Sequence, residues 1–545
     1  MSGIYLDEFK RVARTAFAMW NRDPASASFG SFDRQYWGWK YKDFSDSTLQ
    51  CAVRLAIEYA RLREQTSTLP RLIDGYVSYC GRIQLRDGSF DQCYPYERTP
   101  GVVFDILSTL IYVRQCPYLE SDGEKTELDG IIEKAARFAL HTDETHGAIA
   151  NHYAEYAYEL FHYAKYARNN EALTQANRYL DRVLALFERK EGWFEEYAGP
   201  DPGYQTRTLR YLAKIAELNE RSDLWPVISK AAEFVGELMM PDGSLHPMLG
   251  SRSTALLYPS AFEILARREG RFRGLAAKVR EAWDRRRVPL PSELDFCNAI
   301  RLADDARDAA DASAPAPELT GVPPAVVGPV DYPKAGIAIR RSADRVVYVN
   351  WRLGGVVVVF SRARDQWELT YEDSGYLLKS TGDTDSWLTR MPDSGELLQC
   401  SREILQLQAA FRRSLHDEVT PSRLIILRLL NLTILRIQWV ADWFRKIVVK
   451  RLMGNKVTAP VRLDRRIDIS DNMVTITDSF SFGMAARGML LDGALYRCRR
   501  VTGTHMASSR YFQEAELAAL PSGWMEQVAA PVSTAGPFTT RIGSP

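Results

Sequence analysis

Two short stretches about fifty residues apart carry side chains suited to proton transfer. Asn151-His152 opens one apolar-periodic run, and Gly203-Tyr204 opens another after a Gly/Pro-rich turn at residues 198–202. An amide donates hydrogen bonds to a carboxylate that gathers charge, and an imidazole or a phenol moves protons. These groups suit removal of a proton from a carbon beside a carboxylate. We therefore predict that Asn151, His152 and Tyr204 face one another across a cleft.

The phenol needs help to act as a base. Its unperturbed pKa is about 10, so nearby positive charge must lower it. Arg207, one turn after Tyr204, and Arg252, in the turn Gly250-Ser251-Arg252, are the candidate cations, together with protonated His152. His152 is also a candidate base itself, because an imidazole titrates near pH 6.5.

Structural roles compete with each of these assignments. Asn is a favoured N-cap whose side chain can satisfy a free helix amide. A Tyr after Gly at a helix start is often a packing residue, and an Arg in a turn often bonds to the backbone. The spacing of Asn151, His152, Tyr204 and Arg252 as a set is what favours a catalytic interpretation.

The elements that must position these residues are helical. Apolar residues recur at helical spacing in ranges joined by Gly, Pro and Asp turns, namely 48–60, 102–113, 128–140, 153–166, 173–187, 206–218, 225–239, 255–267 and 274–283. Helical hairpins of this length bury their apolar faces by stacking on neighbours in an arc, ring or solenoid. We predict a helical domain over residues 1–303.

The pattern changes after residue 303. Residues 304–331 are rich in Ala, Asp and Pro without apolar periodicity, which predicts a linker. Beyond it, β-branched runs at 335–339, 345–350, 355–360 and 473–477 predict strands of an antiparallel sandwich over residues 332–545. The fold class is therefore α+β and multidomain, as the length of 545 residues also indicates.

The segment 423–452 does not fit a sheet. It is long, apolar and basic, with Asp442 as its single acid. An inserted amphipathic helix and two long strands are both consistent with it. It packs on the sandwich with its arginines in solvent, or it offers a surface to a membrane or an anionic polymer.

Five short stretches, taken in order, resemble one family. They are Asp87-Gly88-Ser89-Phe90, Tyr94-Pro95-Tyr96-Glu97, Asn151-His152, Gly203-Tyr204 and Gly250-Ser251-Arg252. With the helical hairpins, linker and sandwich, they resemble the heparinase II/III-like and oligoalginate-lyase group of polysaccharide lyases. That resemblance implies an incomplete (α/α) toroid followed by a β-sandwich, and β-elimination beside a uronic acid.

The resemblance also implies residue roles. Asn151 would neutralise the substrate carboxylate, Tyr204 would act as base, acid or both, and His152 would serve as base for the opposite uronate epimer. Aromatic and charged residues near the inter-helix turns would bind the sugar, although large aromatics more often fill cores. These substrate-binding candidates are Trp37, Trp39, Tyr96, Glu97, Arg98, Trp193, Arg207 and, from the sandwich, Tyr376.

We expect no cofactor and no metal. Some members of the group hold zinc in the sandwich, but beyond the linker this chain has only His416 and His505. The formal net charge of +1 gives no reason to expect nucleic acid as a partner. Seven cysteines without CxxC pairing and an N-terminus without an apolar signal region favour a cytoplasmic protein. Oligomeric state, substrate and endo or exo cleavage stay open.

Two other functions remain alternatives. A glycoside hydrolase on a similar toroid would need two carboxylates about 6.5–9.5 Å apart for inversion, from Glu97, Glu195, Glu196 or Asp201. A non-enzymatic protein of exopolysaccharide production would bind polymer with the toroid and touch a membrane with residues 423–452.

Overall fold

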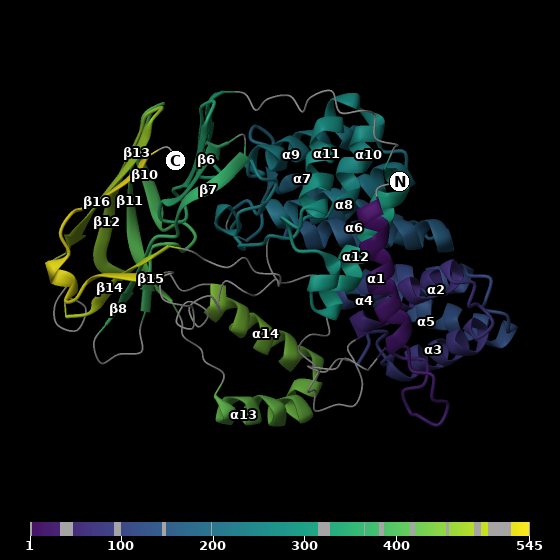
Figure 1. Ribbon diagram of the computed structural model, residues 1–545. Helices are drawn as coiled ribbons and strands as arrows, with labels where there is room; N and C mark the ends of the chain where they lie inside the picture. Colours follow the sequence, from purple (N-terminus) through teal and green to yellow (C-terminus); the bar gives the residue numbers. More distant parts are fainter. Residues whose placement is uncertain are drawn as a thin grey trace.

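The first half of the chain is helical, and the second half is built mainly from strands (Figure 1). This computed structural model describes residues 3–32, 47–91, 100–143, 149–197, 199–313, 327–364, 366–380, 386–414, 420–453, 457–483, 492–499 and 525–543. The predicted α+β class, with helical hairpins preceding an antiparallel sandwich, is confirmed.

The helices of the first half form two layers. The even-numbered helices from α4 to α12 pack in succession, and the turn η1 (Ser47–Cys51) joins α12 to α4, which closes an inner ring. The odd-numbered helices from α5 to α11 each pack on the helix before them. The bounds are α1 Gly3–Met19, α2 Ala52–Leu62, α3 Leu69–Ile83, α4 Pro100–Gln115, α5 Asp122–His141, α6 Ala150–Ala167, α7 Asn170–Ala185, α8 Pro202–Leu218, α9 Trp225–Leu238, α10 Ser260–Arg268, α11 Arg273–Asp284 and α12 Phe296–Ala312.

Helix α12 occupies the start of the predicted linker. Its alanines face the ring core, and its carboxylates, which resemble linker composition in the sequence, form ion pairs inside the ring. Asp304 pairs with Arg54 and Arg210, and Asp305 accepts a hydrogen bond from the Ser260 backbone amide at 3.1 Å. The prediction that the linker begins at 304 is therefore wrong, and strand β3 also begins before residue 331. The domain limits otherwise remain a prediction.

The second half contains two antiparallel sheets. In the described residues the smaller sheet is the meander β3–β4–β5–β6–β7, and the larger has the order β15–β14–β8–β9–β11–β12–β13–β16 with β10 beside β11. The bounds are β3 Gly328–Tyr332, β4 Ile337–Arg341, β5 Arg345–Asn350, β6 Val356–Ala363, β7 Gln366–Asp373, β8 Tyr376–Lys379, β9 Ser386–Leu388, β10 Gly395–Cys400, β11 Ile404–Ser414, β12 Thr458–Ile469, β13 Met473–Phe482, β14 Ala494–Cys498, β15 Met525–Ala529 and β16 Phe538–Gly543.

The central strands β5 and β6 of the smaller sheet are buried on both faces along most of their length. On β5, Val347 and Val349 pack against the larger sheet, whereas Val346 and Tyr348 pack against residues of the helical half that include Phe234. Successive side chains point to opposite faces of a strand, so a strand that is apolar at consecutive positions must be covered on both faces. The continuous apolar runs of β5 and β6 thus dock the sandwich on the helical ring.

The segment 423–452 forms helices, so the alternative of two long strands is excluded. Helix α13 (Pro421–Leu432), the short turn η7 (Ile434–Arg436) and helix α14 (Gln438–Met453) follow one another. In Figure 1 the two helices lie apart from the sheets. We call residues 421–453 the arm. Among the described residues, no helix is long and apolar enough to cross a membrane.

Candidate active site

The starts of α6 and α8 bring the two predicted stretches together. Ile149, the residue before α6, forms a β-bridge with Glu196, in the turn that precedes α8. Asp201 caps α8, because its carboxylate accepts the Tyr204 amide at 3.0 Å. Gly203 allows this turn to close, since a Cβ there would lie 2.7 Å from a Thr254 carbon.

Asn151 is not the helix cap. The N-cap position of α6 is Ile149, and Asn151 lies inside the first turn with its side chain 1% exposed. Its backbone N–H and its amide nitrogen both donate to the Glu196 carboxyl at 2.9 Å. Burial raises the pKa of Glu196 from 4.5 to about 8, although the Asn151 hydrogen bonds oppose the shift. Among the described residues, Asn151 Oδ1 has no hydrogen-bond partner.

Tyr204 lies in the field of two arginines. Burial raises the pKa of its phenol, and Arg252 and then Arg207 oppose that rise. The predicted cations are thus close to the phenol, but burial outweighs them, and the phenol is protonated near neutral pH. The expectation that nearby positive charge brings the pKa of this phenol below its usual value is therefore wrong. A phenol that keeps its proton near neutral pH can donate that proton.

Arg252 is held by two contacts. Its backbone N–H donates to Asp201 at 2.8 Å, and its guanidinium carbon lies 4.3 Å from the centroid of the Tyr197 ring. Tyr197 adopts a positive φ of 65°, which is uncommon for a residue with a side chain. Asp201 therefore positions both Tyr204 and Arg252 through their backbones, while the cation–π contact orients the guanidinium.

Arg207 points to a second buried carboxylate. Its Nη2 donates to Glu155 at 2.7 Å, and the Tyr211 hydroxyl donates to the same carboxyl at 2.6 Å. Burial acts to raise the pKa of Glu155, but Arg207, Arg301, the Tyr211 hydrogen bond and His152 outweigh it and lower the pKa to about 2. His152 is thus within electrostatic reach of this ion pair.

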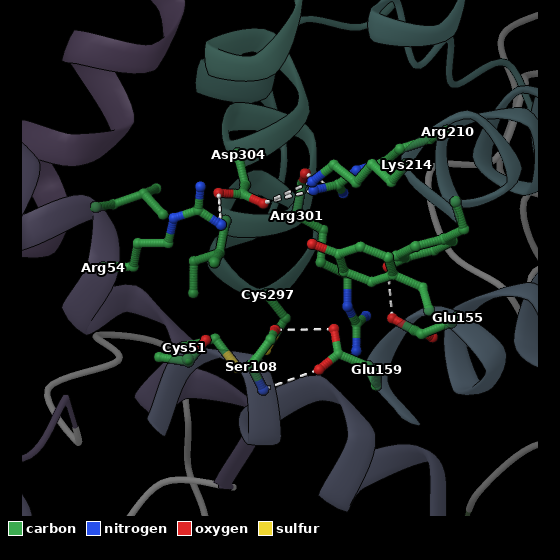
Figure 2. Close-up of a pocket in the computed structure, with 15 residues that line it drawn as sticks. Cys51, Arg54, Ser108, Glu155, Glu159, Arg210, Lys214, Cys297, Arg301 and Asp304 are labelled. Atoms are coloured by element: carbon green, nitrogen blue, oxygen red, sulfur yellow. Dashed lines mark hydrogen bonds and ion pairs between the residues drawn. The ribbon is translucent and has the colours of Figure 1, made fainter. Parts of the chain in front are cut away.

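Glu155 also lines a cavity at the axis of the ring (Figure 2). The cavity encloses about 60 Å³, and its charged lining comes from α2, α6, α8 and α12. Beside it, the Glu159 carboxyl accepts the Ser108 amide and hydroxyl, both at 2.8 Å, and burial raises its pKa to about 8. The axis is therefore a polar core linked to the candidate site through Glu155 and Arg207.

Two predicted sugar-binding aromatics are buried elsewhere. Trp193 is 5% exposed, packs between the helical half and the smaller sheet, and donates its indole N–H to Glu191 at 2.8 Å. It presents no face to a sugar, so that prediction is wrong.

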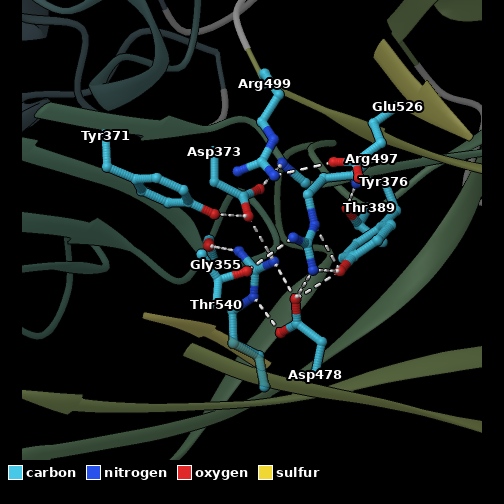
Figure 3. A network of polar contacts seen from close by, with 12 residues as sticks. Gly355, Tyr371, Asp373, Tyr376, Thr389, Asp478, Arg497, Arg499, Glu526 and Thr540 are labelled. Carbon is cyan, nitrogen blue, oxygen red and sulfur yellow. Dashed lines mark hydrogen bonds and ion pairs between the residues drawn. The ribbon is translucent and has the colours of Figure 1, made fainter. Parts of the chain in front are cut away.

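Tyr376 is fully buried in the sandwich, not at a cleft (Figure 3). Its hydroxyl donates to Asp478 at 2.6 Å and accepts from Arg497 at 2.8 Å. Arg465 bonds to both Asp478 and Asp373 in the same network. The role of Tyr376 is structural, and the prediction that it binds the sugar is wrong.

Seven residues considered in the sequence lie outside the described ranges. They are Trp37, Trp39, Tyr96, Glu97 and Arg98, predicted to bind the sugar, and His416 and His505, considered for zinc.

Sequence reasoning missed how two residues act. Glu196 had been considered only as a hydrolase acid, but it anchors Asn151. Asp201 had been considered the same way, but it is fully buried and accepts backbone amides with both oxygens. The Asp-Pro pair at a helix start was a usable capping signal for Asp201. No local signal paired Glu196 with a helix 45 residues earlier in the chain.

The comparisons with known proteins found matches among solved structures alone. No protein-family model and no curated protein matches the chain. The chondroitin AC lyase of Streptomyces coelicolor A3, solved with chondroitin sulphate, is 11% identical, with a TM-score of 0.49 over 91% of this chain and 67% of that chain. A heparinase III is 12% identical, with a TM-score of 0.42 over 91% and 73%. At these identities and TM-scores, neither assigns a residue role or a substrate.

Proposed function

We propose that the protein is a polysaccharide lyase that cleaves a uronic-acid-containing polysaccharide, or its oligosaccharides, by β-elimination. One observation carries the proposal: the phenol of Tyr204 lies in the field of Arg252 and Arg207, beside the Glu196 carboxyl that holds Asn151. A proton donor and two cations thus lie within electrostatic reach of one another, and the carboxyl that orients Asn151 lies within reach of the donor. Such a set suits a substrate in which negative charge grows on a carboxylate.

Asn151 and Arg252 would stabilise that charge. The amide nitrogen has two hydrogens, of which Glu196 accepts one. The second is left for the uronate carboxylate, and Oδ1 is left for a sugar hydroxyl. Donors that strengthen their bonds as the proton leaves C5 stabilise the transition state more than the ground state.

Tyr204 and His152 would share the proton transfers. His152 takes the C5 proton, the freed electron pair forms the C4–C5 double bond, and the C4–O bond breaks. The protonated phenol of Tyr204 gives its proton to the leaving oxygen, and the imidazolium then returns a proton to the phenolate through solvent. This division follows from the raised pKa of Tyr204, which favours the acid role.

Fewer carboxylates remain available for the hydrolase alternative. Asp201 is engaged by backbone amides and serves as a cap, so Glu195 and Glu196 remain as the described acids of that proposal. Product chemistry separates the alternatives, because β-elimination leaves a conjugated double bond and hydrolysis leaves none.

The test is digestion of a panel of uronate polymers, including chondroitin sulphate and heparan sulphate, followed by the ultraviolet absorbance of the unsaturated product. We expect the wild type to produce the signal on at least one polymer and Tyr204→Phe to lower kcat by about 10²-fold or more. Tyr163→Phe is the matched control, since Tyr163 is a buried tyrosine at the far end of α6. Full activity of Tyr204→Phe, or reducing ends without an alkene, would refute the proposal.

A further inference from the structure

The arm exposes an unusual amount of apolar surface. More than half of the exposed large apolar side chains among the described residues lie within it. On α13, Ile425, Leu429 and Leu432 are 54–58% exposed and recur at i, i+4 and i+7. That spacing places them on one face of the helix. The face is a continuous apolar stripe open to solvent.

Helix α14 continues the pattern with aromatic residues. Trp439 is 72% exposed, Trp443 is 59% exposed, and Ile447 follows at 43%, each one turn after the last. Ile434 and Ile437, between the helices, are about half exposed. Tryptophan is the side chain most suited to the boundary between hydrocarbon and water, where its ring is buried and its N–H stays wet.

The arm also concentrates positive charge. It contains seven Lys or Arg and one Asp, whereas the whole chain has 70 Lys and Arg against 69 Asp and Glu. The rest of the chain therefore has a formal excess of five acidic residues. Arg423, Arg436 and Lys446 are exposed beside the apolar stripes. A basic segment on an otherwise acidic protein is attracted to anionic surfaces through that segment first.

Few of the described helices and strands pack against the arm. In the described part of the chain, the substantial packing partner of both α13 and α14 is the turn η7 between them. The helices have 12 and 16 residues, fewer than the about 20 that cross a bilayer. A helix pair of this length with apolar stripes and basic edges lies in the plane of an interface.

We propose that the arm docks the protein on an anionic lipid surface, with Leu429, Trp439 and Trp443 buried at the headgroup boundary and the basic residues against lipid phosphates. Aliphatic side chains distinguish this occupant from an anionic polysaccharide, which has no hydrocarbon to receive them. A second copy of the chain is disfavoured because it would bring two strongly basic arms together.

The test is flotation of the full chain with vesicles of phosphatidylcholine alone and with about 30% phosphatidylglycerol, at about 0.1 M salt. We expect binding to the anionic vesicles that weakens as salt rises. Trp439→Ala with Trp443→Ala is expected to lower the partition coefficient at least about tenfold, since an aromatic ring removes on the order of 150 Å² from water when buried. Leu173→Ala with Leu398→Ala, both exposed outside the arm, is the apolar control.

A second pair of variants tests the charge. Arg436→Gln with Lys446→Gln is expected to weaken binding to the anionic vesicles about 25-fold, from about fivefold for each charge removed. Arg137→Gln with Arg285→Gln, at exposed positions on the ring, is the control and leaves binding unchanged. Thermal unfolding midpoints of all variants establish that each is folded.

Three outcomes would overturn the proposal. The first is failure of the folded wild type to bind anionic vesicles, and the second is equal binding to neutral and anionic vesicles. The third is a variant with both Trp439→Ala and Trp443→Ala that changes oligomeric state but binds vesicles as the wild type does. The last would assign the surface to a second copy. None of them bears on lyase activity toward a soluble polymer, so this proposal and the proposed function fail separately.

Discussion

Glu196 offers a direct test of how burial sets the chemistry of the candidate site. Its pKa is raised from 4.5 to about 8, chiefly by burial. Between these values the folded protein keeps a proton that the unfolded chain loses. The contribution to the free energy of unfolding is therefore complete below about pH 4.5 and is lost as the pH rises toward 8. At about 1.36 kcal/mol for each pKa unit, its upper bound is about 5 kcal/mol.

We expect Glu196→Gln to remove this pH dependence. The glutamine amide does not titrate. Its oxygen can still accept the Asn151 backbone N–H, and its nitrogen can donate to Asn151 Oδ1 once the Asn151 amide turns over. Urea unfolding followed by tryptophan fluorescence at about pH 5 and about pH 8.5 measures the effect as a smaller shift of the midpoint between the two pH values than in the wild type. Glu171→Gln is the control, because that carboxylate is 63% exposed. An unchanged pH dependence in Glu196→Gln would refute the reasoning.

Glu196→Ala separates the anchor from the titration. It leaves two buried donors of Asn151 without their acceptor, at a cost of about 1–3 kcal/mol each. We expect this variant to lose stability at both pH values and to lose lyase activity, whereas Glu196→Gln, which can still bond to Asn151, keeps more activity than Glu196→Ala. Equal activity of the two variants would mean that Glu196 does not orient Asn151.

Two further predictions concern arginines. Arg252→Ala is expected to lower kcat about 10²–10³-fold, and Arg252→Lys is expected to restore part of that rate. Lysine keeps the positive charge near Tyr204 but cannot make the flat contact with the Tyr197 ring. Equal steady-state rates for the Ala and Lys variants would contradict a role of the charge. Arg465→Met is expected to lower the free energy of unfolding by about 3–5 kcal/mol, since it removes the cation that pairs with two buried aspartates and leaves Asp478 with Arg497 at 3.5 Å. Arg466→Met, which removes an exposed pair on the same strand, is the control, and similar urea midpoints for the two variants would contradict the prediction.

The sequence by itself determined the features that depend on neighbours along the chain. The 3.6-residue spacing around Tyr153 and Thr206 predicted α6 and α8, and the apolar run at 345–350 predicted β5. The change of period near residue 330 separated helices from sheets. These signals are local, because side-chain period follows directly from the geometry of a helix or a strand.

Tertiary structure decided where polar and aromatic residues belong. The aspartates of α12 look like a solvated linker until Arg54 and Arg210 neutralise them inside the ring. From the sequence, Tyr376 and Trp193 were candidates for stacking on a sugar ring. In the folded chain, Tyr376 is buried in the sandwich core and Trp193 at the interface between the helical half and the smaller sheet.

The candidate site shows the same division. Spacing along the chain singled out Asn151 and Tyr204, but the partnership of Asn151 with Glu196 and the opposition of burial and arginine charge at Tyr204 exist only in the folded chain. Hydrogen bonds between residues far apart in sequence, and the desolvation that shifts a pKa, depend on which surfaces pack together. No local pattern carries that information.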